Sequence, residues 1–265
     1  MNRKRTAIAI GAHPDDIEFQ MAGTLLLLKA AGYEIHTMNL ASGNCGSLKH
    51  NAATVRRIRL QESRRAANIL GAHLHKPLCD DLEIVYDMKT LRRLAAIIRD
   101  VRPSIVLTHP PIDYMEDHTA TCRLVVTAMF ARGMPNFRTL PARHAGQYDM
   151  ALYHCMPHTL RDPLRQRVLP GAFVNTSTVQ FVKREALRAH QSQQGWLDAS
   201  QKLDSYLQTM EDMARELGRM SKKFKYAEGW RRHLHAGFGE PEGDPMKVLG
   251  SSYLINHAYE RRLRG

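Results

Sequence analysis

The 265-residue chain is predicted to adopt an α/β fold built on a mainly parallel sheet, followed by a mixed, partly helical C-terminal region. Short β-prone segments alternate with helical segments through the first half, which is typical of βαβ units. Hydrophobic residues make up 43% and charged residues 24% of the chain, which are ordinary values for a globular domain. We find neither an internal repeat nor a low-complexity linker, and therefore expect residues 1–265 to form one domain.

The first half of the chain alternates between strand and helix signals. Three short β-prone runs are predicted as strands, namely Thr6–Ala12, Glu34–Ala41 and Ser104–Thr108. Four segments with helical character, each followed closely by Gly or Pro, are predicted as helices, namely Asp16–Ala31, Thr54–Leu70, Thr90–Val101 and His118–Arg132. The start of the chain also resembles a signal peptide, but its apolar run is short and leads directly into a polar motif, which favours a strand.

The second half is less regular. We expect strands at Asp149–His154 and Phe173–Thr178, and helices at Val182–Ala189 and Leu197–Gly218. Several Gly and Pro residues in Gly237–Gly250 predict a loop. No apolar run approaches the roughly 18 residues needed to cross a bilayer, so we predict no membrane span.

The chain is strongly basic, with 38 Lys and Arg against 26 Asp and Glu and a formal net charge of +12. Such an excess favours anionic partners or substrates. A basic run from Arg56 to Arg65 is interrupted by Glu62, and no nucleic-acid-binding motif accompanies it. We therefore favour a solvated helix face, or attraction of a phosphorylated or carboxylated small molecule, over nucleic acid.

The four cysteines are scattered along the chain at Cys45, Cys79, Cys122 and Cys155. They form no Cys-x-x-Cys pair, which argues against a zinc ribbon and a thioredoxin-type motif. Isolated thiols are typical of a reducing compartment, so we predict a cytoplasmic protein.

Polar residues suited to catalysis or metal binding follow three of the predicted strands. These clusters are His13-Pro14-Asp15-Asp16, Ser42–Ser47, and His109 together with Asp113–His118. In open α/β sheets, ligands bind outside the carboxyl ends of the strands. The three clusters therefore fall where this fold class places a functional site.

His13, Asp16 and His118 are candidate ligands of a divalent metal, because two imidazoles and a carboxylate suit zinc and leave a fourth position open. Consecutive helical residues point about 100° apart, so Asp15 and Asp16 are expected to have different roles. A metal held there lowers the pKa of water and polarises a carbonyl group. Asp15 is then the candidate general base.

A purely structural interpretation of the first cluster also exists. Asp15 and Glu18 have the spacing of a capping box, and an acidic residue at a helix start is stabilising by roughly 0.3–1 kcal/mol. Capping explains neither His13 nor the second acidic-histidine pair, Asp117-His118. The combined set therefore favours a metal site.

The segment Ala12-His13-Pro14-Asp15-Asp16-Ile17-Glu18 resembles the signature of the LmbE-like (PIG-L) family of zinc-dependent N-deacetylases. Four further segments are similar to later motifs of that family: Ser42–Gly46, the helix containing Arg59-x-x-Glu62, Asp117-His118 and Lys225–Gly229. The first motif is highly specific and the last is weak. Together the matches spread over most of the chain.

This resemblance implies a Rossmann-like, three-layer fold and hydrolysis of an N-acetyl group, usually on an N-acetylglucosamine moiety. Carried onto the matching positions, the ligands of Zn²⁺, or of another divalent ion such as Fe²⁺, are His13, Asp16 and His118. Asp15 activates the water. Members of the family often form homo-oligomers, so a homo-oligomer is a further expectation.

Two more residues receive roles from the same resemblance. Asp117 is expected to contribute to catalysis by orienting a neighbouring side chain. Arg59 corresponds to a position that often contacts the substrate. The adjacent Arg56, Arg57 and Arg64 leave a solvated helix face as the alternative for Arg59.

The chain departs from the family at Met115. The family motif commonly reads His-Pro-Asp-His, and its first His helps to stabilise the oxyanion, whereas this chain reads Met115-Glu116-Asp117-His118. Methionine cannot donate a hydrogen bond to an oxyanion, and loss of one such donor can lower the rate ~10²- to 10³-fold. The imidazoles that are candidates to replace this donor are His109, His154, His158 and His190.

Three functional hypotheses follow from this departure. The first is a zinc-dependent deacetylase of an amino-sugar conjugate. The second is the same hydrolase acting on a different substrate, such as a longer N-acyl chain or a sugar linked to an aglycone. The third is a metal- or anion-binding protein with weak or no deacetylase activity, because Met115 replaces the oxyanion histidine.

Overall fold

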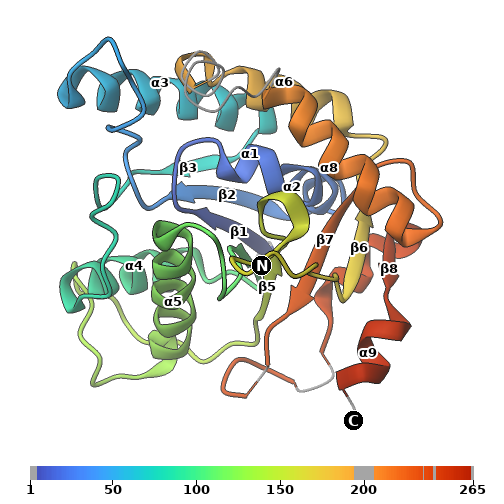
Figure 1. Ribbon diagram of the computed structural model, residues 1–265. Coiled ribbons are helices and arrows are strands. Elements are labelled where there is room, and N and C mark those ends of the chain that lie inside the picture. The colour runs from blue at the N-terminus through green and yellow to red at the C-terminus, as the bar shows by residue number, and fades with distance from the viewer. Residues whose placement is uncertain (1–4, 194–205, 235, 241–242, 264–265) are drawn as a thin grey trace.

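The computed structural model describes residues 5–193, 206–234, 236–240 and 243–263. Within these residues one sheet has the strand order β3-β2-β1-β4-β5-β7-β6-β8 (Figure 1). The strands are β1 (Thr6–Gly11), β2 (Glu34–Asn39), β3 (His73–His75), β4 (Ile105–Thr108), β5 (Ala151–Cys155), β6 (Ala172–Asn175), β7 (Ala227–Arg232) and β8 (Tyr253–Ile255). From β3 to β5 every pair is parallel, whereas the pairs beyond β5 are antiparallel. The predicted mainly parallel sheet and mixed C-terminal region are thus confirmed.

Helices cover both faces of this sheet and give the expected three-layer, Rossmann-like fold (Figure 1). One face is covered by α4 (Met88–Val101) and α5 (Glu116–Phe130). On the other side lie α1 (Asp16–Gln20), α2 (Ala22–Ala30), α3 (Ala52–Leu70), α6 (Gln180–Arg188) and α8 (Tyr206–Ser221), while α9 (His257–Leu263) lies near the C-terminal end. Short 3-10 turns occur at Ala131–Gly133, His158–Leu160 and Pro245–Ser252. None of the described helices is long and apolar enough to cross a membrane.

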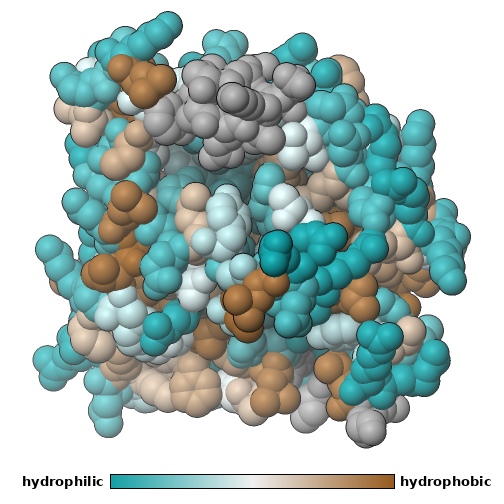
Figure 2. Space-filling view, in the orientation of Figure 1, coloured by the Kyte–Doolittle hydropathy of each residue, from teal (hydrophilic) through white to brown (hydrophobic). Residues whose placement is uncertain are grey.

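Alternation along β1 shows how the sheet divides the core. Ile8 and Ile10 pack in the apolar cluster beneath α4 and α5, whereas Ala7 and Ala9 pack in the cluster beneath α1 and α2. Both sets are fully buried, as expected for a central strand of a parallel sheet. Figure 2 shows the outer surface on one side of the molecule, where hydrophilic side chains dominate and hydrophobic ones are scattered.

The structure corrects several boundaries of the predicted elements. The helix predicted for Asp16–Ala31 is divided at Met21, whose φ of −130° is not helical. Strands β3, β7 and β8 and helix α9 were not predicted, and a 3-10 turn begins inside the predicted loop Gly237–Gly250. Of the helix predicted at Leu197–Gly218, residues 206–218 lie in α8 and residues 197–205 lie outside the described residues.

The late motif Lys225–Gly229 has a structural role. Its buried Glu228, on β7, accepts hydrogen bonds from the backbone N–H groups of Gly23 and Thr24 at 2.8 and 2.7 Å. Lys183 donates a further bond to Glu228 at 2.6 Å. Because a carboxylate at a helix start complements the helix dipole, Glu228 anchors the first turn of α2 to the antiparallel end of the sheet.

Candidate active site

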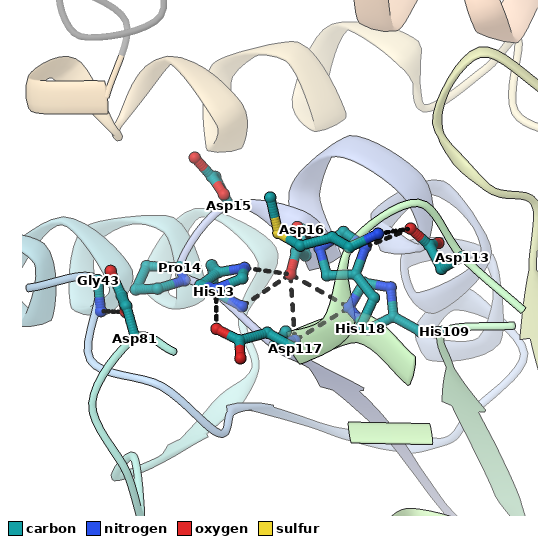
Figure 3. A network of polar contacts seen from close by, with 12 residues as sticks. His13, Pro14, Asp15, Asp16, Gly43, Asp81, His109, Asp113, Asp117 and His118 are labelled. Atoms are coloured by element: carbon teal, nitrogen blue, oxygen red, sulfur yellow. Dashed lines mark hydrogen bonds and ion pairs between the residues drawn. The ribbon is translucent and has the colours of Figure 1, made fainter. Parts of the chain in front are cut away.

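Three loops that follow adjacent parallel strands form the candidate site. Strands β2, β1 and β4 are neighbours in the sheet, so the polar clusters after them meet at one edge. Figure 3 shows His13 from the loop after β1 and Asp16 from the start of α1 facing His118, which lies in the first turn of α5. These side chains line a cavity of about 360 Å³, together with Asp15 and Arg59.

The three predicted metal ligands are brought together. One ligand atom from each of His13, Asp16 and His118 lies within 4.8 Å of the other two. Asp16 Oδ2 lies 3.6 Å from His13 Nδ1, and Asp16 Oδ1 lies 3.5 Å from His118 Nε2. Separations of this size place two imidazole nitrogens and one carboxylate around a common point.

A carboxylate holds the other ring nitrogen of each histidine. His13 Nε2 donates to Asp117 at 2.9 Å, and His118 Nδ1 donates to Asp113 at 3.1 Å. Metal-ligating histidines show this arrangement, because the carboxylate fixes the tautomer and leaves the opposite nitrogen free to bind. Asp117 therefore contacts its neighbour His13, as its predicted orienting role requires. The contact of Asp113 was not predicted, and no motif in the sequence signals it.

These carboxylates also control the charge of the site. Burial opposes protonation of His13, but hydrogen bonds from Asp117 and Asp16 outweigh it and raise the pKa of His13 to about 10. In the same way, Asp16 and Asp113 overcome the effect of burial and raise the pKa of His118 to about 9. The surrounding carboxylates thus favour a positive charge on both rings.

Asp16 is held as an anion. Its Oδ2 accepts hydrogen bonds from the backbone N–H groups of Ala12 and His13 at 3.1 and 2.7 Å. Burial alone raises the pKa of a carboxyl group, but His118 and His109 hold the pKa of Asp16 well below its ordinary range. An ionised carboxylate at this position is suited to metal binding.

A second group with metal-ligand chemistry, His109, Asp113 and His118, shares one member with the first. His109 is fully buried, stacks on His118 at 3.9 Å, and accepts a hydrogen bond from the Ala12 N–H at 3.0 Å. Neither His109 nor Asp113 lines the cavity. The group of His13, Asp16 and His118 is therefore the better candidate for a metal that must reach a substrate.

Asp15 does not cap the helix that follows it, so the capping interpretation is wrong. It adopts a left-handed conformation with φ of 106°, and its side chain makes no capping hydrogen bond. Figure 3 shows Asp15 pointing away from Asp16, as the predicted division of roles requires. Burial raises the pKa of Asp15 against the opposing attraction of Arg59, which favours a carboxylate able to take up a proton.

Arg59 is a buried residue, so the alternative of a solvated helix face is wrong for this position. Its side chain is 1% exposed and donates to Asp15 at 3.1 Å and to Glu62 at 3.3 Å. It also donates to the carbonyl oxygen of Pro14. The neighbouring arginines on the outer side of α3 are exposed, and these are Arg56, Arg57, Arg64 and Arg65. Arg59 therefore positions the Asp15 carboxylate at the cavity wall.

The glycine-containing loop after β2 is shaped by the same arginine. Gly43 has φ of +78°, and a Cβ atom there would lie 2.8 Å from Arg59 Nε. Asp81 holds the loop by accepting hydrogen bonds from the backbone N–H groups of Gly43 and Cys45 at 2.7 and 3.0 Å. A side chain at position 43 would be strained by the positive φ and would crowd Arg59, so this position requires glycine.

The structure reduces the number of histidines that could replace the missing oxyanion donor. Met115 lines the cavity, and among the four candidate histidines only His158 lines it as well. His109 lies behind His118, His154 donates to the His109 carbonyl at 2.7 Å, and His190 lies against Glu18. Tyr114, which the sequence did not single out, also lines the cavity, and its ring centroid lies 5.8 Å from that of His118 and 6.1 Å from that of His158.

Known proteins resemble this chain over most of its length. The family model described as PIG-L, GlcNAc-PI de-N-acetylase, matches residues 8–129. The diacetylchitobiose deacetylase of Thermococcus kodakarensis is 29% identical over 237 residues, which cover 87% of this chain and 84% of that protein. The uncharacterized deacetylase YaiS of Escherichia coli is 31% identical over 134 residues, which cover 48% of this chain and 69% of that protein.

A solved structure shows the same fold in a protein with another activity. GalB, the 4-carboxy-2-hydroxymuconate hydratase from Pseudomonas putida, has a TM-score of 0.72 and 24% identity, covering 86% of this chain and 95% of that one. The family match spans both segments that contain the candidate metal ligands, from His13 to His118. Together with the relative from E. coli, it shows that the chain belongs to the PIG-L (LmbE-like) family.

Proposed function

We propose that this protein is a metal-dependent hydrolase that removes an N-acetyl, or other N-acyl, group from an amino-sugar conjugate of the N-acetylglucosamine type. One observation carries the proposal. His13, Asp16 and His118 present ligand atoms to a cavity, and the buried carboxylate of Asp15 lies at the wall of the same cavity. The two similar proteins from T. kodakarensis and E. coli are both described as deacetylases, which supports this reaction class.

The side chains around the cavity fit a divalent metal. His13 Nδ1, His118 Nε2 and an Asp16 oxygen supply the ligands, and Asp117 and Asp113 occupy the other ring nitrogens. A Zn²⁺ ion, or another divalent ion such as Fe²⁺, would supply Lewis acidity toward water and toward the amide carbonyl. Three protein ligands leave room for water and substrate.

Asp15 is assigned the proton transfers. Its carboxylate takes a proton from the water that attacks the amide carbon, and it then gives that proton to the nitrogen as the C–N bond breaks. Arg59 fixes the orientation of Asp15 through the 3.1 Å contact between the guanidinium and Asp15 Oδ2. The raised pKa of Asp15 suits a group that must hold a proton between two steps.

His158 is assigned the hydrogen bond to the oxyanion that Met115 cannot make. Burial lowers the pKa of His158, so its ring is neutral near pH 7 and carries one N–H to donate. It lies at the cavity, and its ring and that of His118 both lie near the ring of Tyr114. His158→Phe should therefore lower kcat more than it raises KM, whereas the opposite pattern indicates a role in substrate binding.

The properties of the whole chain guide the choice of substrate and setting. The net charge of +12 and the exposed arginines of α3 favour an anionic sugar conjugate over nucleic acid. Cys45, Cys79, Cys122 and Cys155 are all free, which supports a reducing, cytoplasmic compartment. We propose that the protein forms a homo-oligomer, and light scattering of the purified chain would test this.

A panel of substrates tests the proposed reaction. The zinc-loaded protein is incubated with N-acetylglucosamine, N,N′-diacetylchitobiose, a carboxylated N-acetylglucosaminide and a longer N-acyl analogue, and free amine is measured. Amine release that a chelator abolishes and zinc restores is the expected result. Release only from the longer or anionic members identifies an altered substrate, which Met115 favours.

Absence of amine release from every member overturns the hydrolase and favours a metal- or anion-binding protein. The fold does not itself select the reaction, because the hydratase from P. putida shares it. The same protein sample is therefore also tested for hydration of 4-carboxy-2-hydroxymuconate by loss of its ultraviolet absorbance. Hydration without amine release would replace the proposed deacetylase with a hydratase.

A further inference from the structure

A second group of histidines lies on strands β2 and β3, outside the cavity. It consists of Glu34, His36, His73 and His75, and we call it the edge cluster. Glu34 and His73 are the first residues of β2 and β3, whereas the candidate active site follows the carboxyl ends of the parallel strands. His36 pairs with His73 in the parallel register. Because side chains alternate along a strand, Glu34 and His36 on β2 point to the same face of the sheet as His73 and His75 on β3.

One carboxylate oxygen of the edge cluster lies near two imidazole nitrogens. Glu34 Oε1 is 3.3 Å from His36 Nε2 and 3.5 Å from His73 Nε2. Nitrogen and oxygen ligands bound to zinc at about 2.0–2.2 Å lie roughly 3.3–3.5 Å apart in a tetrahedral site. Each imidazole therefore already stands at a ligand-to-ligand separation from the carboxylate.

His36 has a ring nitrogen that is buried without a hydrogen bond. The His36 side chain is 11% exposed, and its Nε2 makes no hydrogen bond despite the nearby carboxylate. Its other ring nitrogen, Nδ1, lies 3.0 Å from His75 Nε2, which fixes the orientation of the His36 ring. A buried ring nitrogen that lies beside a carboxylate without hydrogen-bond geometry is in a position that a bound cation would satisfy.

The inner histidines are packed against each other and the outer one is free to move. The His36 and His75 rings stack with centroids 5.2 Å apart, and the His36 and His73 ring centroids are 5.0 Å apart. His73 has a side chain that is 66% exposed, so its ring can turn toward an ion without displacing packed neighbours.

We propose that Glu34, His36 and His73 bind a second divalent transition-metal ion, separate from the candidate active site, and that His75 orients His36 for this purpose. Two imidazoles and a carboxylate favour Zn²⁺, Ni²⁺ or Cu²⁺ over Ca²⁺ or Mg²⁺. Because His73 is exposed, the ion is accessible to solvent and exchanges readily. The proposal does not depend on the proposed deacetylase function, since none of these residues lines the catalytic cavity.

Zinc titration of a tag-free, chelator-stripped chain tests this site, with the bound metal measured by calorimetry and by elemental analysis. The wild type is expected to bind one more Zn²⁺ per chain than His73→Ala, at pH 7.5. His118→Ala, which removes a candidate active-site ligand, should keep the edge ion, and combining it with His73→Ala should abolish that binding. These arms separate failure of the proposed active-site metal from failure of the edge site.

Two further variants sharpen the result. His144→Ala removes an exposed histidine outside the cluster and should bind as much zinc as the wild type. His75→Phe keeps all three ligands but loses the ring nitrogen that orients His36, and should weaken the edge site about 10- to 100-fold. Equal zinc binding by the wild type and His73→Ala, with both folded by circular dichroism, overturns the proposal.

Discussion

The two histidine groups of this protein lie at different places on the same sheet and have opposite electrostatics. In the candidate active site, hydrogen bonds to carboxylates outweigh burial and raise the pKa values of His13 and His118 to about 10 and about 9. In the edge cluster, burial and neighbouring imidazoles lower the pKa of His75 to about 4 and also lower that of His36. Burial acts in the same direction in both places, so the neighbours decide the outcome.

The difference shows what a strong cation site requires. Asp16, Asp113 and Asp117 surround two imidazoles in the active site, whereas Glu34 is the carboxylate in contact with the imidazoles of the edge cluster. A surplus of negative charge attracts a metal ion strongly, while a surplus of neutral imidazoles binds it without charge neutralisation. We therefore expect the active site to bind zinc more tightly than the edge cluster.

Asp15→Asn should give the largest effect, because it removes the proposed proton acceptor of the candidate active site. The edge cluster is left unchanged by this substitution. We expect turnover to fall ~10²- to 10⁴-fold while zinc content stays at the wild-type level. Steady-state kinetics on the best substrate of the panel, with metal analysis of the same sample, measure both. Asp149→Asn, the same change at an exposed position, is the control. Unchanged turnover in Asp15→Asn would refute the assignment of Asp15.

Asp113→Asn makes the surroundings of His118 more like those of His36, because a neutral amide replaces a carboxylate beside the ring nitrogen. The affinity of the active site for zinc should fall about 10- to 100-fold, since the partner of a ligating histidine tunes its basicity. Competition with a chromophoric chelator measures the dissociation constant. Glu116→Gln removes the same charge from an exposed neighbour and should leave the affinity unchanged. Equal affinities in all three proteins would remove the electrostatic basis of the comparison.

His154 tests the effect of burial on a histidine that belongs to neither group of candidate ligands. Burial lowers the pKa of His154 to about 4. As the pH falls below 6.5, the unfolded chain binds a proton that the folded chain does not, so the free energy of unfolding decreases. The expected decrease is about 1.4 kcal/mol per pH unit between pH 6.5 and pH 4.

Urea unfolding of metal-free wild type and His154→Gln at pH 7, 6 and 5 measures this decrease. The amide of the variant can still donate to the His109 carbonyl but does not titrate in this range. The wild type should lose more stability toward pH 5 than the variant does. Parallel pH dependences in the two proteins would show that His154 does not titrate as its buried position predicts.

Local sequence patterns were sufficient to predict which residues meet in the candidate site. The first motif is contiguous, and polar residues follow the strands that become neighbours in the sheet, so topology alone brings His13 and His118 together. The contact between Asp113 and His118 was not predictable in this way. It depends on the path of the loop after β4, which no periodicity or spacing specifies.

The elements that escaped prediction owe their structure to distant partners. Strand β7 contains Glu228, Arg231 and Arg232, charged residues that disfavour a strand when considered alone. It forms because it pairs with β5 and β6 and because Glu228 finds Lys183 and the start of α2. For the same reason the burial of Arg59 among exposed arginines was invisible in the charge pattern of its helix.

The hydrogen bond from Gly23 to Glu228 joins residues 205 positions apart and therefore constrains how the chain folds during synthesis. Until β7 leaves the ribosome, the first turn of α2 lacks its acceptor and Lys183 lacks its counter-ion. Such long-range closure slows folding, because an extended stretch of chain must be ordered before these contacts form. The loop that carries the candidate catalytic residues thus rests on a scaffold that is completed only after residue 228 has been synthesised.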